Sequence, residues 1–198
     1  LVVLCAAMAF TDQRKNFFGP RNTVNILQQV SLLSLFAIGE TIVIITGGID
    51  LSLGSIIAFT GMICALLLVK FSVGLVAVPA LLLAITLTLI VALAIGLVHG
   101  TLIHKLKLPP FVVTLAALLI LRSQSLVVNK QLPISVAEYP LLTQLATTGP
   151  LLIILAIVGV IVHILLSRTR IGRYLYAIGS NETATRLSGV NVFKVKLF

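Results

Sequence analysis

The chain has 198 residues, of which 59% are hydrophobic and only 10% are charged, and its mean hydropathy is +1.20. A soluble domain carries roughly 45–50% apolar and about 25% charged residues, and a chain this short cannot hide so much apolar surface from water. The net charge of +9 comes from basic residues between long apolar runs, so membrane orientation explains it better than nucleic-acid binding. These values exclude a cytosolic enzyme, a disordered tail and a secreted disulfide scaffold.

Six apolar runs follow one another along the chain. A membrane-spanning helix needs about 20 mostly apolar residues, and open strands leave unpaired backbone groups in lipid. We therefore predict an all-α, polytopic transmembrane helical bundle that forms a single domain over residues 1–198. We expect the first run to be the end of a truncated span and the chain to be a fragment truncated at both ends. The six runs cover about residues 1–10, 24–45, 56–69, 75–103, 111–128 and 150–167.

The basic residues predict the orientation of the spans. Residues 168–198 carry six basic side chains against Glu182 alone, so we place this segment in the cytoplasm. Alternation then places Lys105 and Lys107 on the same side. It also places the segment around Arg14 and Arg21 outside, against the positive-inside rule, and we keep it because the carboxy-terminal cluster is larger.

A glycine-rich break separates the second and third runs at residues 47–55, with the sequence GGIDLSLGS. One interpretation is a tight turn at the membrane surface, in which Asp50 caps the next helix by accepting from its first N–H groups. The other is a broken helix whose exposed backbone lines a polar path, because non-helical backbone at membrane depth is tolerated where protein or water satisfies it. The sequence leaves both open.

Polar side chains inside the runs give a candidate solute path. An ionisable residue within a span is costly and suggests a function, although Glu40 could equally be a neutral side chain hydrogen-bonded between helices. Arg122 could face a polar cavity or extend to the outer membrane interface. Hydroxyl and amide groups nearby could hydrogen-bond a hydroxylated solute. The candidate path residues are Glu40, Asp50, Ser52, Thr114, Arg122 and Gln124.

Motifs for covalent chemistry and metal binding are absent from the sequence. It contains no phosphate-binding loop, no HExxH pair and no nucleophile elbow. Cys5 and Cys64 lie in apolar runs without metal-ligand spacing. The three histidines, His99, His104 and His163, lie far apart, and we expect them to pack within the bundle or at its interfaces. We therefore predict no catalytic residue, no metal site and no cofactor bound by this chain.

A short helix is predicted in the cytoplasmic segment at residues 181–189. Asn181 suits the N-cap, Glu182 suits the first turn and Gly189 suits the position just after the helix. A helix of about two turns is marginal alone in water, so we expect it to dock against its own membrane domain or a partner.

Three segments resemble a known family, the ribose-type monosaccharide ABC transporter permeases. Residues 47–55 look like the family's GGIDLSVGS motif, and residues 108–115 are similar to its PPFIVTL segment. Residues 168–191 look like its RTRFGRYIYAIGGNE run followed by AARLSGIN. The departures are Ser180 for a glycine, Thr183 and Thr185 where small or acidic residues are common, and Gln124 near a usual glycine.

The resemblance implies a type II importer in a bacterial inner membrane. Two permease copies, identical or different, would form the path in the lipid bilayer. ATP-binding cassette subunits would use ATP and Mg below it, and a periplasmic sugar-binding protein would deliver the monosaccharide. Residues 168–198 would form the cytoplasmic coupling loop of a single permease domain that performs no covalent chemistry. The coupling helix that docks on the ATPase would comprise Asn181, Glu182, Thr183, Ala184, Arg186, Leu187 and Gly189.

Two other functions remain alternatives at this stage. An ion-coupled secondary transporter of a small polar solute would use Asp50 and Glu40 to couple solute to an ion. A structural or anchoring membrane subunit would have no solute path, and its Glu40 and Arg122 would be dispensable. The sequence does not identify the sugar.

Overall fold

The computed structural model describes residue 10, residues 14–130 and residues 132–197. All regular elements in this part of the chain are helices, and five of them are long and apolar enough to cross a membrane. This confirms the all-α polytopic bundle. The first predicted run falls almost wholly on residues 1–9, outside the described residues. The five spanning helices are α3 (Pro20–Ile45), α4 (Leu53–Phe71), α5 (Ala77–Lys105), α6 (Pro110–Val127) and α8 (Thr148–Arg168).

Short helices connect or flank the spans. The outer ends carry α2 (Arg14–Phe17) and α7 (Pro140–Leu145), and the opposite end carries α9 (Arg170–Ser180), α10 (Glu182–Leu187) and α11 (Val192–Leu197). Proline occupies the first position of α3, α6 and α7, where its missing N–H and fixed φ are tolerated. Pro133 and Pro140 lie between the last two spans, where proline disfavours a long helix, and α7 has only six residues.

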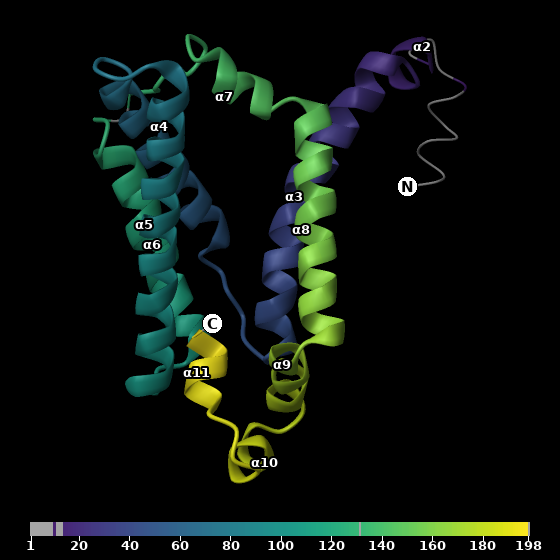
Figure 1. Ribbon diagram of the computed structural model, residues 1–198, viewed down its shortest axis with the longest axis vertical. Helices are drawn as coiled ribbons and strands as arrows, with labels where there is room; N and C mark the ends of the chain where they lie inside the picture. The colour runs from purple at the N-terminus through teal and green to yellow at the C-terminus, as the bar shows by residue number, and fades with distance from the viewer. Residues whose placement is uncertain (1–9, 11–13, 131, 198) are drawn as a thin grey trace.

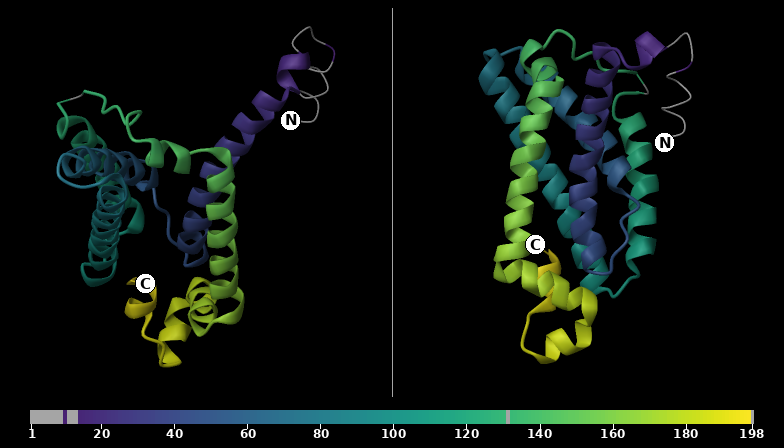
Figure 2. Two further views of the ribbon diagram at one scale, coloured as in Figure 1. Left: turned by 45° about the horizontal axis from the view of Figure 1, so that its top comes forward. Right: turned by 90° about the vertical axis from the view of Figure 1, so that its right-hand side faces the viewer.

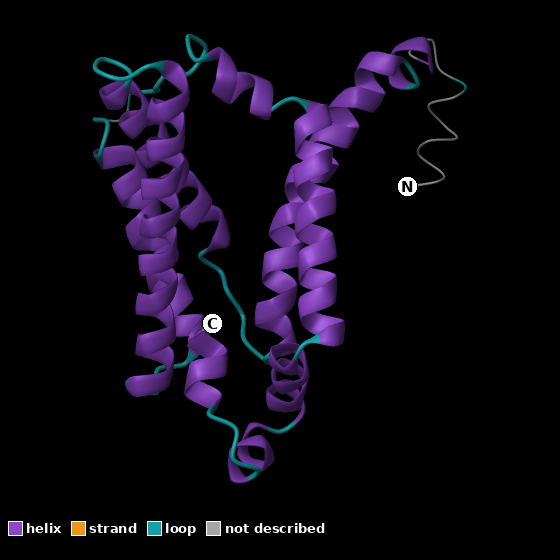
Figure 3. Ribbon diagram, in the orientation of Figure 1, coloured by secondary structure: helices purple, strands orange, loops and turns teal. Residues whose placement is uncertain are grey.

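The spans form two groups. Helix α4 packs against α5 and α6, whereas α3 packs against α8 (Figure 1). Helix α7 touches α5 and α8 at one end, and α11 touches α5 and α9 at the other, so short helices join the two groups at both ends (Figure 2). Coloured by secondary structure, the long loop between α3 and α4 runs between the groups (Figure 3).

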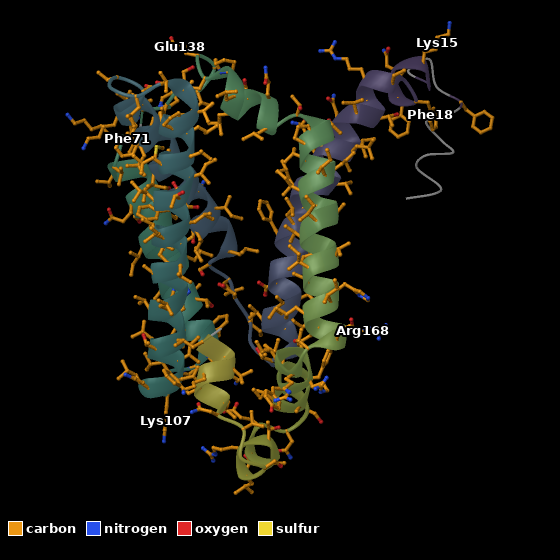
Figure 4. The ribbon with its side chains drawn as sticks, in the orientation of Figure 1. Lys15, Phe18, Phe71, Lys107, Glu138 and Arg168 are labelled. Carbon is orange, nitrogen blue, oxygen red and sulfur yellow. The ribbon has the colours of Figure 1, made fainter. Side chains whose placement is uncertain are left out.

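Charged residues lie at both ends of the bundle. Lys15 and Glu138 lie at one end of the bundle, and Lys107 and Arg168 lie at the other (Figure 4). The second end also carries α9, α10 and α11, which hold most of the basic residues of the carboxy-terminal segment. By the positive-inside rule we expect this end to be cytoplasmic.

The buried core is small, and lipid must cover the rest of the apolar surface. Leu68, Ala80, Leu81 and Ala84 form a buried cluster between α4 and α5, with Tyr139 packed against it. The Tyr139 hydroxyl lies 3.0 Å from the Ser72 hydroxyl and ties the outer loop to the end of α4. Large apolar side chains elsewhere on the spans are widely exposed, as expected for helices that face hydrocarbon.

Candidate functional site

Helix α3 ends in a tight turn. The Gly47 N–H donates to the Ile44 carbonyl at 2.9 Å, and the Gly48 N–H donates to the Val43 carbonyl at 3.0 Å. Gly47 has a φ of +76°, in the left-handed region where glycine carries no steric penalty. The turn therefore satisfies the last carbonyl groups of α3 and redirects the chain. We call the non-helical residues 46–52 the polar elbow.

The polar elbow lies within the membrane-spanning part of the bundle. Helix α4 has 19 residues and α5 has 29, which correspond to about 28 Å and about 43 Å of length at 1.5 Å per residue. The two helices meet at the outer end, so α4 starts well above the cytoplasmic end of α5, and the elbow rises to reach it. The structure thus contains both a turn at the end of α3 and non-helical backbone at depth.

The predicted capping role of Asp50 is wrong. Helix α4 begins at Leu53 with Ser52 as its N-cap residue, and no side chain caps it. Asp50 lies two residues before that position, and its Oδ1 accepts from the Ser52 N–H at 2.7 Å and from the Ser52 hydroxyl at 2.6 Å. Because its carboxylate bonds its own backbone two residues on, Asp50 stabilises the elbow rather than the helix.

Two spanning helices hold the elbow from either side. The Asp50 N–H donates to Glu40 Oε1 of α3 at 3.4 Å, and the Thr114 hydroxyl of α6 donates to the Ile49 carbonyl at 3.3 Å. Glu40 Oε2 is buried without a hydrogen-bond partner in the described residues. The structure therefore brings together Glu40, Asp50, Ser52 and Thr114 of the candidate path.

Arg122 and Gln124 do not join this group. Both are exposed on α6. Arg122 lies eight residues beyond Thr114 towards the outer end, a distance of about 12 Å along a helix. An exposed arginine near the outer end of a span fits the interpretation that it extends to the membrane interface.

A cavity of about 470 Å³ lies beside the polar elbow, within the size range of about 300–1,000 Å³ for small-molecule sites. Asp50 and Thr114 line it, Lys196 and Leu197 of α11 lie at its cytoplasmic side, and His99 of α5 lines it as well. His99 was expected to pack within the bundle or at its interfaces. An ionisable residue within the most apolar long helix was the signal that pointed to it.

The short cytoplasmic helix predicted at residues 181–189 is confirmed as α10. Asn181 Oδ1 accepts from the Ala184 N–H at 2.9 Å, and Gly189 follows the helix with a φ of +84°. Lys196 of α11 donates a hydrogen bond to Glu182 and holds the pKa of that carboxyl below its usual value. Leu187 is 84% exposed, an unusual position for a leucine on a helix outside the membrane.

Two further cytoplasmic helices were not predicted. In α9 the Thr169 hydroxyl accepts from the Gly172 N–H at 3.1 Å, and Leu175 and Ile178 are buried. The apolar spacing of Ile171, Leu175 and Ile178 is the helical pattern that would have revealed this helix. Helix α9 also passes very close to the end of α3, because a Cβ atom at Gly179 would collide with the Ile45 carbonyl oxygen.

A search for metal-ligand groups gives none. In the part of the chain that the structure describes, no three His, Cys, Asp or Glu side chains gather where they could hold a metal ion.

Comparison with protein families assigns the chain. A family model described as "Branched-chain amino acid transport system / permease component" matches residues 22–198, most of the sequence. The chain belongs to this family. With five apolar spanning helices in its described part, this member is a multi-pass inner-membrane protein.

Curated relatives are named as sugar import permeases. The ribose import permease protein RbsC of Escherichia coli (strain K12) is 39% identical over 205 residues, which cover 100% of this chain and 61% of the relative. RbsC of Bacillus subtilis (strain 168) is 38% identical over 188 residues, 92% of this chain and 56% of the relative. The fructose import permease protein FrcC of Rhizobium meliloti is 31% identical over 193 residues, 90% of this chain and 51% of the relative. The chain thus spans 51–61% of the length of these relatives. No solved structure matches it.

Proposed function

We propose that this chain is the membrane-spanning permease subunit of an ATP-driven importer, and that it forms the translocation path for a monosaccharide. The observation that carries the proposal is the matching of 90–100% of this chain to permeases named for ribose and fructose import. The family description names branched-chain amino acids instead. The relatives favour a sugar, because permeases that are 31–39% identical to this chain are named for ribose and fructose import.

The proposed path runs past the polar elbow. Asp50 and Thr114 offer carboxylate and hydroxyl oxygens to a cavity of about 470 Å³, while Glu40 and Ser52 hydrogen-bond Asp50 and hold it in place. A monosaccharide is uncharged and rich in hydroxyl donors, so these acceptors suit it. Arg122 and Gln124 stay predictions for the outer half of the path.

The proposed site of energy coupling is α10. It lies at the cytoplasmic end, is capped at both ends, and exposes Leu187 beyond the bundle. A partner ATPase that uses ATP and Mg would bind this helix, and the chain itself would bind no cofactor. Closure of the ATPase dimer would move α10 together with α9 and α11, which contact α3 and α5.

The proposed mechanism is alternating access without covalent chemistry. A periplasmic binding protein would deliver the sugar to a dimer of permeases, whose two copies are identical or different. The path would hold sugar weakly, because the binding protein supplies affinity and a tight site within the membrane would slow release. The ATPase would then bias a two-state helical bundle.

An ion-coupled secondary transporter is the second candidate. The observation that favours it is the buried Glu40 Oε2 without a partner, a place where a proton could reside. Such a protein would move solute without an ATPase. A purely structural subunit would instead tolerate replacement of Glu40.

The first experiment is purification of the tagged full-length permease, expressed with its neighbouring genes, in mild detergent. We expect an ATP-hydrolysing subunit to co-purify, and substitutions within residues 182–189 to release it. Liposomes containing the complex should take up ribose or fructose only with ATP and the binding protein. A permease that purifies alone and moves solute without ATP would establish the secondary transporter instead.

A further inference from the structure

His99 is an ionisable side chain within the largely apolar helix α5. The helix runs over 29 largely apolar residues, and His99 is a half-buried polar side chain in its cytoplasmic half. It lines the same cavity as Asp50 and Thr114.

Asp50 and His99 both keep hydrogen-bonding capacity that the described residues do not satisfy. Both hydrogen bonds to the Asp50 carboxylate end on Oδ1, and Oδ2 accepts none in the described residues, while Asp50 is one of the residues that line the cavity. Within residues 14–130 and 132–197 no hydrogen bond to the His99 ring is formed. A partly buried donor and a partly buried acceptor that face one cavity without being satisfied favour a polar ligand between them.

We propose that His99 is a further solute-binding residue of this cavity, where its imidazole donates a hydrogen bond to one oxygen of a polyhydroxylated solute while Asp50 accepts from a hydroxyl of the same solute. The inference rests on the proposed import function and names the chemistry of its site. A carboxylate accepts only, whereas a neutral imidazole both donates and accepts, so the pair matches hydroxyl groups, which do the same.

The same chemistry disfavours a hard metal cation as the occupant. Such cations prefer several oxygen ligands, and an imidazole replaces one of them poorly. The described residues offer Asp50 and Thr114 oxygens here, with Lys196 adding a positive charge at the cytoplasmic side of the cavity. The surroundings therefore fit an uncharged solute better than a cation.

The first test compares His99→Leu, which fills the space without hydrogen bonding, with His99→Asn, which keeps a donor and an acceptor. Full-length permease complexes in liposomes would be assayed for ATP-driven uptake of D-ribose and D-fructose at saturating binding protein. We expect His99→Leu to lower uptake about tenfold, since a group hydrogen-bonded to the solute loses its partner, and His99→Asn to retain most of it. His163→Leu is the matched control, because His163 also lies in an apolar span but outside this cavity.

The second test detects the solute at the site itself. In a background in which Cys5, Cys64 and any further cysteine of the full-length permease are replaced by serine, Ile103→Cys, which keeps His99 and lines the same cavity, would be labelled with a small thiol reagent. The sugar that the wild-type complex imports should slow this labelling, whereas sodium chloride should not, and labelling of His163→Cys should be unaffected. Equal labelling with and without that sugar would overturn the inference, as would wild-type uptake by His99→Leu.

The outcomes separate the two proposals. A wild-type complex that imports no sugar contradicts the import function, whatever the variants do. A wild-type complex that imports sugar while His99→Leu behaves like His163→Leu contradicts the role of His99 alone. Uptake that depends on a proton gradient without ATP would contradict the proposed ATP-driven import and, with it, the inference that rests on it.

Discussion

The Nζ atom of Lys196 on α11 lies 2.7 Å from Oε2 of Glu182 on α10. This ion pair links the proposed coupling helix to a helix that touches α5 beside the cavity, where Leu197 lies against Gly100. Half of the Glu182 side chain remains exposed, so the pair contributes at most about 1 kcal/mol to stability. If α10 is the coupling helix, this ion pair would join its movement to that of α11.

The first prediction concerns the pH dependence of this link. The hydrogen bond from Lys196 lowers the pKa of Glu182 in the folded protein. The pair therefore contributes fully above the ordinary carboxyl pKa of 4.5, and the contribution is lost as the pH falls through the lower folded value. We expect hydrogen-exchange protection of α11 to be constant between about pH 7 and pH 5 and to fall under stronger acid.

Glu182→Gln should abolish the acid-dependent loss of hydrogen-exchange protection in α11, because position 182 then carries no titrating carboxyl group. It should also lower the protection of α11 at neutral pH, because the ion pair is absent. The matched control is Glu138→Gln, since Glu138 is an exposed glutamate at the outer end of the bundle. High salt should weaken the wild-type link and leave the Glu182→Gln protein unchanged. Identical protection in both proteins at neutral pH would show that the ion pair does not hold α11.

The second prediction concerns the crossing of α9 and α3. A side chain at Gly179 would collide with the Ile45 carbonyl oxygen, a backbone atom that cannot move aside cheaply. We expect Gly179→Ala to destabilise the protein by about 1–3 kcal/mol, the usual size of an overpacking effect. Thermal unfolding in detergent would measure it. Gly61→Ala is the control, because nothing lies within 4 Å of a Cβ atom there, and it should be neutral or stabilising.

The third prediction concerns the ends of α10. Gly189 has a φ of +84°, which a β-branched residue adopts only with strain, so Gly189→Val should destabilise the helix end by about 1–2 kcal/mol. Asn181→Ala should cost about 1 kcal/mol through loss of the bond to the Ala184 N–H. If α10 is the coupling helix, both variants should also recover less ATPase on purification. Gly189→Asn tolerates the left-handed conformation and serves as the control.

The fourth prediction concerns Asp50. Replacing it with alanine removes the acceptor for the N–H and hydroxyl of buried Ser52, so we expect ATP-driven uptake to fall about tenfold or more. Asp50→Asn keeps one acceptor oxygen and should have a smaller effect. Co-purification of the ATPase should be normal in both, because Asp50 lies away from α10. Unchanged uptake in Asp50→Ala would make the carboxylate dispensable.

The fifth prediction concerns orientation. Lys15 lies at the end of the bundle opposite Lys107. With Cys5 and Cys64 replaced by serine, cysteines introduced at these two positions should react with an impermeant thiol reagent from opposite sides of the membrane. Position 15 should react in intact cells whose outer membrane is permeabilised, and position 107 only after the inner membrane is opened. Reaction of both from one side would refute the assigned topology.

Several features could be predicted from the sequence because they depend on local chemistry. Long apolar runs must be helical in lipid, so the five described spans followed from composition alone. The caps of α10 could be read from Asn181 and Gly189, because each acts on backbone within a few residues. The break after α3 was visible in Gly47 and Gly48 for the same reason.

Tertiary structure decided the features that depend on distant segments. Asp50 was expected to cap α4, yet it bonds Ser52 while its own N–H meets Glu40 ten residues earlier. His99 acquires a functional setting only because α5 lies across the cavity from the elbow, and an apolar helix of uniform hydropathy does not reveal which of its faces meets that cavity. Gly179 likewise looks like an ordinary helix residue until α9 crosses the end of α3. Helix formation is local, whereas these contacts depend on how two groups of helices pack, and packing is set by the whole chain.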